Sequence, residues 1–300
     1  MGILVSAIGQ GLIWATLGIG LFLSFRILNF PDMTVEGTFP LGAAVSVTLI
    51  ASGVDPFISA IVAALAGGVA GMVTGLLYTK GKIPILLAGI LTMTAIYSIN
   101  LRIMGQANKS LLGDKTLFNA KFLNFLPTNF PTVIVGLVLI TIITGGMALF
   151  LQTELGQAFI ATGDNPAMAR SMGINSDAMT NMGLVISNAL IAFGGALVAQ
   201  NNGFSDVNMG IGIIVVALAS IIIGEVAFSD QMTLGERLIT IVIGSILYRF
   251  VLVAVLYVGF NANDLNLFSA VILGLALLLP KLRSALNLNK VVKNGGSTHA

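Results

Sequence analysis

Six polar side chains interrupt the long apolar stretches of this 300-residue chain: Asp32, Thr34, Glu36, Asp206, Asn208 and Arg249. Carboxylates, hydroxyls and amides accept hydrogen bonds, and a guanidinium binds a carboxylate through two parallel hydrogen bonds. Such side chains can line a path for a solute or form ion pairs with one another. Which of these they do depends on the elements that carry them.

The composition places those elements in a membrane. Hydrophobic residues make up 56% of the chain, charged residues only 9%, and the mean hydropathy is +1.00. A soluble domain carries about 25% charged residues, so we expect an integral membrane protein in contact with the lipid bilayer. The net charge of +2 gives no reason to expect a nucleic acid partner. Without cysteine, and with His299 as the only histidine, the chain is expected to hold no disulfide, metal site or histidine-based catalytic dyad.

The apolar runs predict an all-α, polytopic membrane protein of about eight to ten helices, forming a single transmembrane domain of residues 1–300. A helix needs about 20 apolar residues to cross the hydrocarbon layer. The runs at 38–53 and 210–228 are the least regular, and no run alternates as a membrane β-strand does. The predicted spans are 3–25, 38–53, 57–79, 84–104, 131–152, 178–199, 210–228, 238–258 and 264–280.

Lysine and arginine predict the orientation, because they are enriched in cytoplasmic loops. Placing the polar tail at 281–300 in the cytoplasm puts the N-terminus outside, since the number of spans is odd. Nine basic residues then lie inside, among them Arg26, Lys82 and Arg170. Four lie outside, namely Arg102, Lys109, Lys115 and Lys121.

Two short strings resemble each other, "NFPDMTVEG" at 29–37 and "GFSDVNMGIG" at 203–212. Each carries Phe-x-Asp after an apolar span and leads through polar residues and glycine into another apolar run. The spans before them run in opposite directions, which predicts an inverted repeat with a broken helix in each half. Interrupted spans at matching positions indicate a transport path, so Asp32, Thr34, Glu36, Asp206 and Asn208 are candidates to line it.

Simpler interpretations of these residues stay open. The two strings can be alike by chance. Asp32 and Glu36 can lie in a short inner turn that touches headgroup water, with Asp32 or Thr34 capping the next helix. Asp206 and Asn208 can lie in a similar turn at the outer surface.

Arg249 lies near the middle of the 238–258 run. A charge at that depth costs about 2.5–3.5 kcal/mol on insertion scales and persists where it faces protein or water. Two hypotheses follow. Arg249 pairs with Asp32, Glu36 or Glu225, or it receives the carboxylate of a solute.

Gly67, Gly71 and Gly75 share one face of the 57–79 run. Small residues at this spacing let helix backbones approach closely in lipid. We expect them to serve packing within the chain rather than a dimer seam.

The loop at 153–177 is predicted to be folded. Residues 154–162 indicate a short helix, and Asn165 can cap a second one that has Pro166 at its first position. Arg170 falls in the last turn of that helix and Gly173 provides a left-handed stop. Ser176 or Asp177 is expected to cap the next span. A pair of short helices facing the cytoplasm suits the docking of a partner.

The string "LGQAFIATGDNPAMARSMGIN" also resembles the cytoplasmic loop of ABC importer permeases of the branched-chain amino acid and ribose type. The matching positions are Gly156, Ala158, Ala161, Gly163, Asn165, Ala169, Gly173 and Ile174. The resemblance covers nearly the whole chain. "DMTVEGTFPLGAAV" and "GSILYRF" resemble a branch that serves aromatic amino acids such as tryptophan or tyrosine.

The resemblance implies a permease in a bacterial plasma membrane, as a homodimer or half of a permease pair. Two cytoplasmic ATPases would dock on the loop, an extracytoplasmic binding lipoprotein would deliver the solute, and ATP and Mg²⁺ would bind only to the ATPases. The loop residues that would couple to the ATPases are Glu154, Gly156, Ala161, Gly163, Asn165, Pro166, Arg170 and Gly173. This chain itself is expected to be no enzyme, since "GLLYTKGKI" departs from a phosphate-binding loop in spacing and has Ile83 where Ser or Thr belongs.

Two other classes compete with an ATP-driven importer. Inverted repeats and broken helices would also suit an ion-coupled secondary transporter. The folded 153–177 loop argues against it, because such a carrier has no reason to build a docking loop. An intramembrane enzyme is disfavoured because the spans contain no histidine or cysteine and the acidic residues are scattered.

Overall fold

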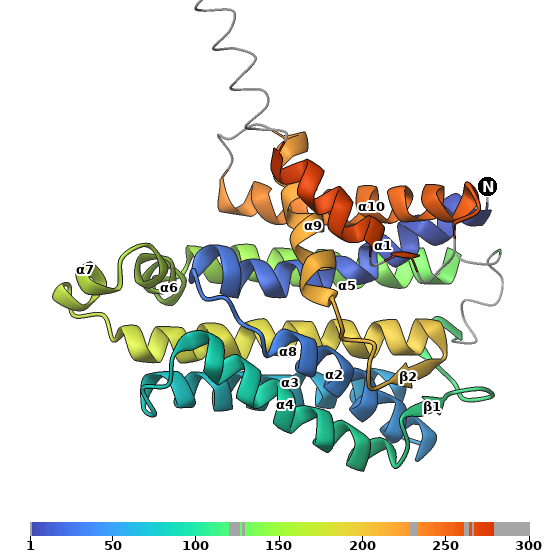
Figure 1. Cartoon of the computed structure of the whole chain (residues 1–300), viewed down its shortest axis with the longest axis horizontal. Coiled ribbons are helices and arrows are strands. Elements are labelled where there is room, and N and C mark those ends of the chain that lie inside the picture. Colours follow the sequence, from blue (N-terminus) through green and yellow to red (C-terminus); the bar gives the residue numbers. More distant parts are fainter. Residues whose placement is uncertain are drawn as a thin grey trace, which may run out of the picture.

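A computed structural model describes residues 2–119, 127, 130–228, 233–260, 264–265 and 267–278, and these residues are almost entirely helical (Figure 1). The α-helices are α1 Gly2–Leu21, α2 Val35–Ala51, α3 Pro56–Thr79, α4 Ile85–Met104, α5 Phe130–Gln152, α6 Glu154–Asp164, α7 Pro166–Ser171, α8 Ser176–Asn202, α9 Ile213–Ala227 and α10 Leu234–Tyr257. A π-helix, η1 Phe22–Ile27, continues α1, and a 3₁₀ turn, η2 Leu117–Asn119, precedes α5. Two short strands are β1 Asn108–Ser110 and β2 Phe204–Asp206.

The predicted all-α, polytopic fold is confirmed. Each predicted apolar run contains a helix, the last of them at Leu267–Leu278. In the described part of the chain, however, only six helices are long and apolar enough to span a bilayer. At 1.5 Å per residue, the 17 residues of α2 and the 15 of α9 reach about 26 and 22 Å, less than the roughly 30 Å of hydrocarbon. These are the two runs with the least regular sequence.

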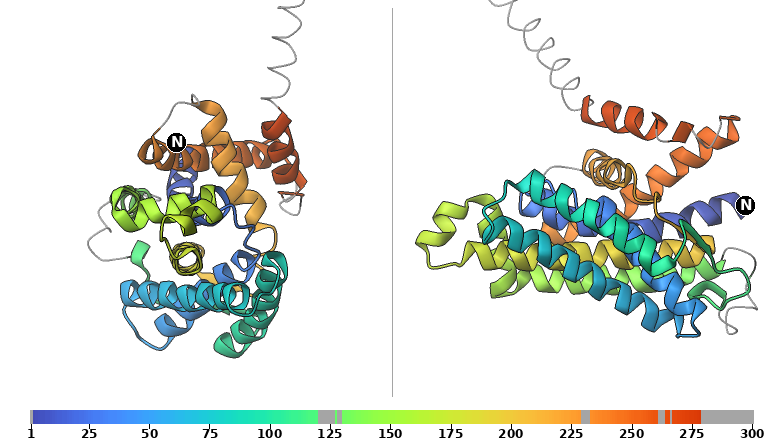
Figure 2. Two further views of the ribbon diagram at one scale, coloured as in Figure 1. Left: turned by 90° about the vertical axis from the view of Figure 1, so that its left-hand side faces the viewer. Right: turned by 60° about the horizontal axis from the view of Figure 1, so that its bottom comes forward.

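Helix α8 lies at the centre of the bundle. Figure 2 shows it end-on in the left-hand view, surrounded by the other helices. It packs against α1, α2 and α3. A Cβ atom on Gly67 or Gly71 of α3 would overlap the carbonyl oxygens of Asn188 and Leu184 on α8. The predicted role of the α3 glycines in packing within the chain is therefore confirmed.

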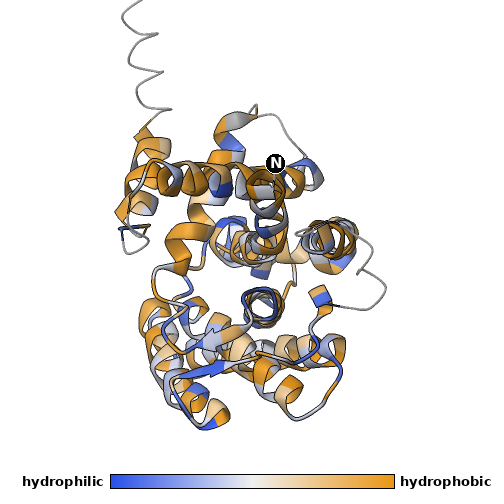
Figure 3. Ribbon diagram, turned by 90° about the vertical axis from the view of Figure 1, so that its right-hand side faces the viewer, coloured by the Kyte–Doolittle hydropathy of each residue, from blue (hydrophilic) through white to orange (hydrophobic). Residues whose placement is uncertain are grey.

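The bundle has two opposite ends. One carries α6 and α7, at the left of Figure 1, and the other carries β1, β2 and the N-terminus, at the right. We refer to them as the α6–α7 end and the β1–β2 end. Figure 3 looks onto the β1–β2 end: the helices are largely hydrophobic, and the strands are hydrophilic.

The chain turns between η1 and α2 and again between α8 and α9, at the two strings that resemble each other, while the inverted repeat itself stays a prediction. Helix α1 and η1 run to the α6–α7 end, the chain turns back, and α2 starts beside the middle of α8 and runs to the β1–β2 end. Helix α8 runs to the β1–β2 end, the chain turns through 203–212, and α9 starts next to α2 and crosses the bundle transversely (Figures 1 and 2). Near the end of α9, Glu225 pairs with Arg26 of η1 at 3.2 Å.

The sequence did not predict β1 and β2, which pair antiparallel with Asn108 opposite Asp206. Each has only three residues, and the partner segments are far apart in the chain. Lys121 and the tail at 281–300 lie outside the described residues. The single-domain assignment of residues 1–300 stays a prediction.

Candidate functional site

The loop at 153–177 folds into α6 and α7, as predicted. Thr153 caps α6 by accepting a hydrogen bond from the Gly156 amide at 3.2 Å, and Glu154 lies in the first turn. At the end of α6, the carbonyl of Ala161 accepts a hydrogen bond from the Asn165 amide. These local bonds leave few backbone groups of the loop without partners, so its shape is defined by its own sequence.

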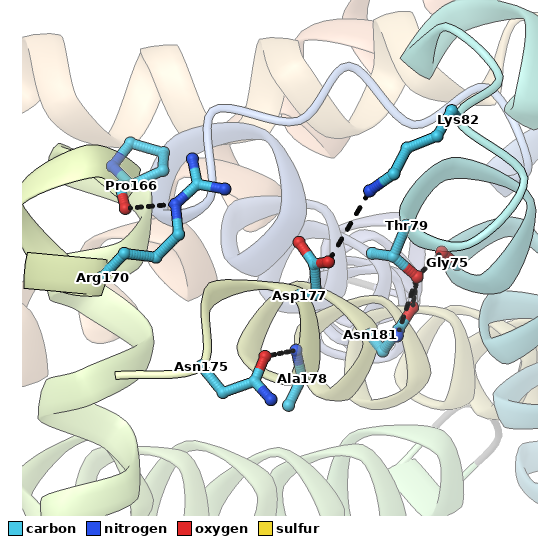
Figure 4. Close-up of polar contacts among 9 residues, drawn as sticks. All are labelled: Gly75, Thr79, Lys82, Pro166, Arg170, Asn175, Asp177, Ala178 and Asn181. Carbon is cyan, nitrogen blue, oxygen red and sulfur yellow. Dashed lines mark hydrogen bonds and ion pairs between the residues drawn. The ribbon is translucent and has the colours of Figure 1, made fainter. Parts of the chain in front are cut away.

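Helix α7 has the predicted cap and stop. The Asn165 side chain accepts hydrogen bonds from the amides of Ala167 and Met168 at 3.1 and 3.0 Å. Pro166 occupies the first position, and Arg170 lies in the last turn with its Nε donating to the Pro166 carbonyl at 3.2 Å (Figure 4). Gly173 has φ +85°, a left-handed conformation that glycine adopts without strain.

The predicted cap of α8 is wrong. Asn175, rather than Ser176 or Asp177, accepts a hydrogen bond from the Ala178 amide at 3.1 Å (Figure 4). Ser176 instead donates to the Pro166 carbonyl at 3.1 Å, which ties α7 to α8. Asp177 lies 3.9 Å from the Lys82 ammonium, in an exposed ion pair.

The inner face of α6 is fitted closely to the bundle. A Cβ atom on Gly163 would overlap the Ile27 carbonyl at the end of η1, and one on Gly156 would overlap the Phe150 carbonyl. The Asn29 side chain donates to the Gly163 carbonyl at 3.3 Å. Phe159 is buried and its ring contacts Phe150. Helix α6 is therefore in direct contact with the segment that breaks the first span.

The outer face of the same loop exposes large apolar side chains next to charged ones. Leu155, Met168 and Met172 are 55%, 59% and 68% exposed, next to the exposed Glu154 and Arg170. Figure 1 shows α6 and α7 at the extreme left of the molecule. Apolar side chains that project with charged neighbours beyond the bundle form a surface suited to a protein partner.

The first break is a buried polar network. Asp32 is 1% exposed, and its carboxylate accepts hydrogen bonds from the Asn188 side chain at 2.7 Å and the Thr34 amide at 2.9 Å. The Thr34 hydroxyl contacts that of Thr74 at 2.8 Å and does not cap α2. Thr38 donates to Asn188 at 2.9 Å. Asp32 therefore does not lie in a water-exposed turn, and its carboxylate joins the break to α8 through Asn188.

The second break has the same local turn in a different setting. The Asp206 carboxylate accepts a hydrogen bond from the Asn208 amide at 2.7 Å, as Asp32 does from Thr34. Its other oxygen accepts from the Asn108 side chain at 3.2 Å, across the β1–β2 pair. Asp206 is half-buried and Asn208 is exposed. The likeness of the two strings thus extends to backbone geometry, but Asp206 and Asn208 lie at the β1–β2 end.

The two broken spans meet at Glu36. Its carboxylate accepts a hydrogen bond at 3.1 Å from the amide of Gly212, the residue before α9. Gly210 lies against the Glu36 carbonyl with no room for a Cβ atom. Glu36 is half-buried in the first turn of α2. The N-terminal ends of α2 and α9, each positive because of unpaired amide groups, therefore converge on one carboxylate. The sequence did not reveal this contact.

Arg249 makes none of the predicted ion pairs. Asp32 bonds to Asn188, Glu36 to Gly212, and Glu225 forms a two-point pair with Arg26. The Arg249 guanidinium instead lies over the Trp14 ring, 3.9 Å from its centroid. Its Nε is buried without a hydrogen-bond partner among the described residues. The ion-pair hypothesis is therefore wrong, and the solute hypothesis stays a prediction.

Comparisons with known proteins agree with the resemblance seen in the sequence. A family model described as "Branched-chain amino acid transport system / permease component" matches residues 3–279. A tyrosine transport system permease protein of Clostridioides difficile (strain R20291) is 39% identical over 270 residues, 90% of this chain and 88% of that protein. An uncharacterized protein of Rickettsia prowazekii (strain Madrid E) is 36% identical over 92% of this chain and 97% of its own length.

Two more distant similarities were found. The D-allose transport system permease protein of Escherichia coli (strain K12) is 27% identical over 79% of this chain and 71% of that protein. Among solved structures, PsaBC from Streptococcus pneumoniae in complex with Fab covers 92% of this chain and 89% of that chain. Its TM-score of 0.49 and sequence identity of 16% are too low to bear on function.

Proposed function

This chain belongs to the family of permease components of branched-chain amino acid transport systems, and from that premise we propose that it imports an aromatic amino acid such as tyrosine. It is the transmembrane permease subunit of an ATP-binding-cassette importer in a bacterial plasma membrane. The observation that carries the choice of solute is the 39% identity to a tyrosine permease over 90% of the chain. The strings "DMTVEGTFPLGAAV" and "GSILYRF" also favour an aromatic amino acid as the solute.

Family membership implies a cytoplasmic ATPase and a binding protein as partners. We propose that the ATPase docks on α6 and α7, through the exposed face of Leu155, Met168 and Met172. The residues from Glu154 to Gly173 give this face its shape. The chain itself is expected to bind no cofactor, so that ATP and Mg²⁺ act only in the ATPase.

We propose that two copies of the chain form the complete permease. Each chain carries one 153–177 loop, and a dimer of ATPases presents two docking sites. A homodimer supplies two identical loops. The extracytoplasmic binding protein would then approach from the β1–β2 end, which carries Asp206 and Asn208.

The contacts described above support a route by which ATPase motion changes access. Gly163 fits against Ile27, and Asn29 bonds to Gly163, so a displacement of α6 acts directly on the end of η1. The following residues lead to Asp32 and Thr34 at the start of α2. The pair of Arg26 and Glu225 connects η1 to the end of α9. Both broken spans are thus linked to the loop.

We propose that the solute passes the junction of α2 and α9, with Glu36 and Arg249 nearest the path. Asp32 and Thr34 hold the first break, while Asp206 and Asn208 lie at the outer entrance. An ion-coupled carrier is the competing function, and family membership argues against it.

Reconstituted transport separates these functions. The chain, with the ATPase and binding protein encoded by neighbouring reading frames, is placed in proteoliposomes and supplied with radiolabelled tyrosine. We expect uptake that requires ATP and the binding protein and is unaffected by a sodium or proton gradient. Branched-chain amino acids and ribose serve as competing solutes. Gradient-driven uptake by the chain alone would contradict the proposal.

A further inference from the structure

Two residues are partly exposed within stretches that are otherwise buried. From Gly11 to Ser24, every residue of α1 and η1 is buried except Trp14. From Thr34 to Ala44, every residue is buried except Glu36. Trp14 and Glu36 are therefore the accessible side chains of these otherwise enclosed stretches.

Contacts through Phe39 connect Trp14 with Glu36. The Trp14 ring contacts the ring of Phe39, with centroids 5.6 Å apart. Phe39 follows Glu36 by one turn of α2, and Glu36 accepts the hydrogen bond from Gly212 before α9. Trp14 is thus connected through Phe39 to the first turn of α2 and, through Glu36, to the residue before α9.

Arg249 brings an unsatisfied positive charge to Trp14. Its guanidinium stacks on Trp14, an attraction between the cation and the ring face that satisfies none of its five N–H donors. It has no hydrogen bond or ion pair with any described residue. An arginine in a membrane span normally pairs with an acidic group or faces water. The partner that this arginine lacks among the described residues has the chemistry of a carboxylate.

The depth of Arg249 argues against a lipid phosphate as that partner. Helix α10 continues from Arg249 to Tyr257, about 12 Å further at 1.5 Å per residue. The ring on which the guanidinium lies belongs to the middle of α1. A headgroup phosphate lies outside the hydrocarbon layer, whereas a solute in transit crosses it.

We propose that Arg249, held against Trp14, binds the carboxylate of an aromatic amino acid as it passes through the permease. Trp14, supported by Phe39, presents an aromatic surface next to that charge. This inference rests on the proposed function, and it adds a residue that selects for a carboxylate within the membrane. A solute without a carboxylate leaves the guanidinium unpaired and is disfavoured.

The only tryptophan in the chain reports on this site directly. Emission of Trp14, excited at 295 nm to avoid tyrosine, is followed in the purified chain during titration with tyrosine and with tyramine, its decarboxylated analogue. Tyrosine is expected to shift or quench the emission, and tyramine is expected to have no effect at the same concentrations. Equal responses to both, or no response to millimolar tyrosine, would overturn the proposal.

Variants give the second part of the test. Arg249→Gln is expected to weaken the tyrosine response at least tenfold, and Arg249→Lys to retain part of it, because it keeps the charge but not the planar fork. Arg102→Gln removes an exposed arginine from α4 and serves as the matched control, with no expected change. Because Arg249 has no hydrogen bond or ion pair to lose among the described residues, Arg249→Gln should fold and co-purify with the ATPase as the wild type does.

Transport distinguishes failure of this inference from failure of the proposed function. If the wild-type complex imports tyrosine with ATP and the Arg249→Gln complex imports it at the same rate, the carboxylate site is overturned while the function stands. If the wild-type complex imports no tyrosine at all, the proposed function fails. Import by the wild type with a loss of at least tenfold in Arg249→Gln, at unchanged ATPase co-purification, is the result expected here.

Discussion

The two breaks in the membrane spans carry the same motif in opposite surroundings. At Asp32 and at Asp206 the carboxylate accepts a hydrogen bond from the amide two residues later, so the local turn is shared. Asp32 is buried against Asn188 of α8, whereas Asp206 is half-buried and bonds to Asn108 across two short strands. The turn at each break follows from its own Phe-x-Asp string. The packing around it decides whether the break is fixed inside the bundle or lies at a surface.

The largest expected effect is a difference between the two breaks in how much a lost carboxylate lowers the free energy of unfolding. Asp32→Ala removes the carboxylate that accepts a hydrogen bond from the Asn188 side chain. It is expected to lower the free energy of unfolding by about 3 kcal/mol, which is the upper end of the range for a hydrogen bond to a charged group. Asp206→Ala, the matched variant, is expected to lower it by less than about 1 kcal/mol. Unfolding by SDS titration in micelles measures both. Equal losses would contradict the comparison.

The next effect tests how the first break is fixed to the 153–177 loop. Gly163→Ala places a Cβ atom on the Ile27 carbonyl, and such overpacking is expected to destabilise the chain by about 1–3 kcal/mol. Gly145→Ala in α5 is the control, because a Cβ atom there meets nothing within 4 Å. We expect it to be neutral or to stabilise by up to about 1 kcal/mol. A destabilisation shared by both variants would show that the Gly163 contact is not specific.

A smaller effect is expected where the two breaks meet. Glu36→Leu removes the acceptor of the Gly212 amide and is expected to lower the free energy of unfolding by about 1.5 kcal/mol. Glu36→Gln keeps an acceptor oxygen and is expected to lose less than half of that. Both are measured by the same SDS titration. A larger loss in the glutamine variant would mean that charge, rather than the hydrogen bond, joins α2 to α9.

The smallest effects belong to the exposed ion pairs at the α6–α7 end. A double-mutant cycle of Arg26→Ala and Glu225→Ala is expected to give a coupling free energy below about 1 kcal/mol. Lys82→Ala, which removes the longer pair with Asp177, is expected to be neutral within about 0.5 kcal/mol. A coupling of several kcal/mol for Arg26 and Glu225 would contradict this ranking and show that charge holds the end of α9 against η1.

Local signals in the sequence predicted much of this architecture. Each apolar run forms a helix, and Asn165, Pro166 and Gly173 shape α7 as their types require. The same reasoning failed at the start of α8, where Ser176, Asp177 and Asn175 are all good capping residues. Only the hydrogen bond from Ser176 to Pro166, formed across the loop, decides between them.

Contacts between distant segments could not be predicted. Strands β1 and β2 are three residues long and pair over almost a hundred positions, so neither has a local pattern of its own. The hydrogen bond of Glu36 to Gly212 and the stacking of Arg249 on Trp14 depend on how four helices pack. The sequence predicted acidic partners for Arg249 because it does not reveal that Asp32, Glu36 and Glu225 each bond to a different residue.

The central claim is that α6 and α7 form the surface on which an ATPase drives the two breaks. Co-purification of the ATPase with the double variant Met168→Asp/Met172→Asp tests it most directly, with Leu112→Asp at the β1–β2 end as the exposed control. We predict that the loop variant loses the ATPase and ATP-driven uptake while remaining folded, and that the control keeps the ATPase. ATPase binding and uptake at wild-type levels in the loop variant would contradict the claim.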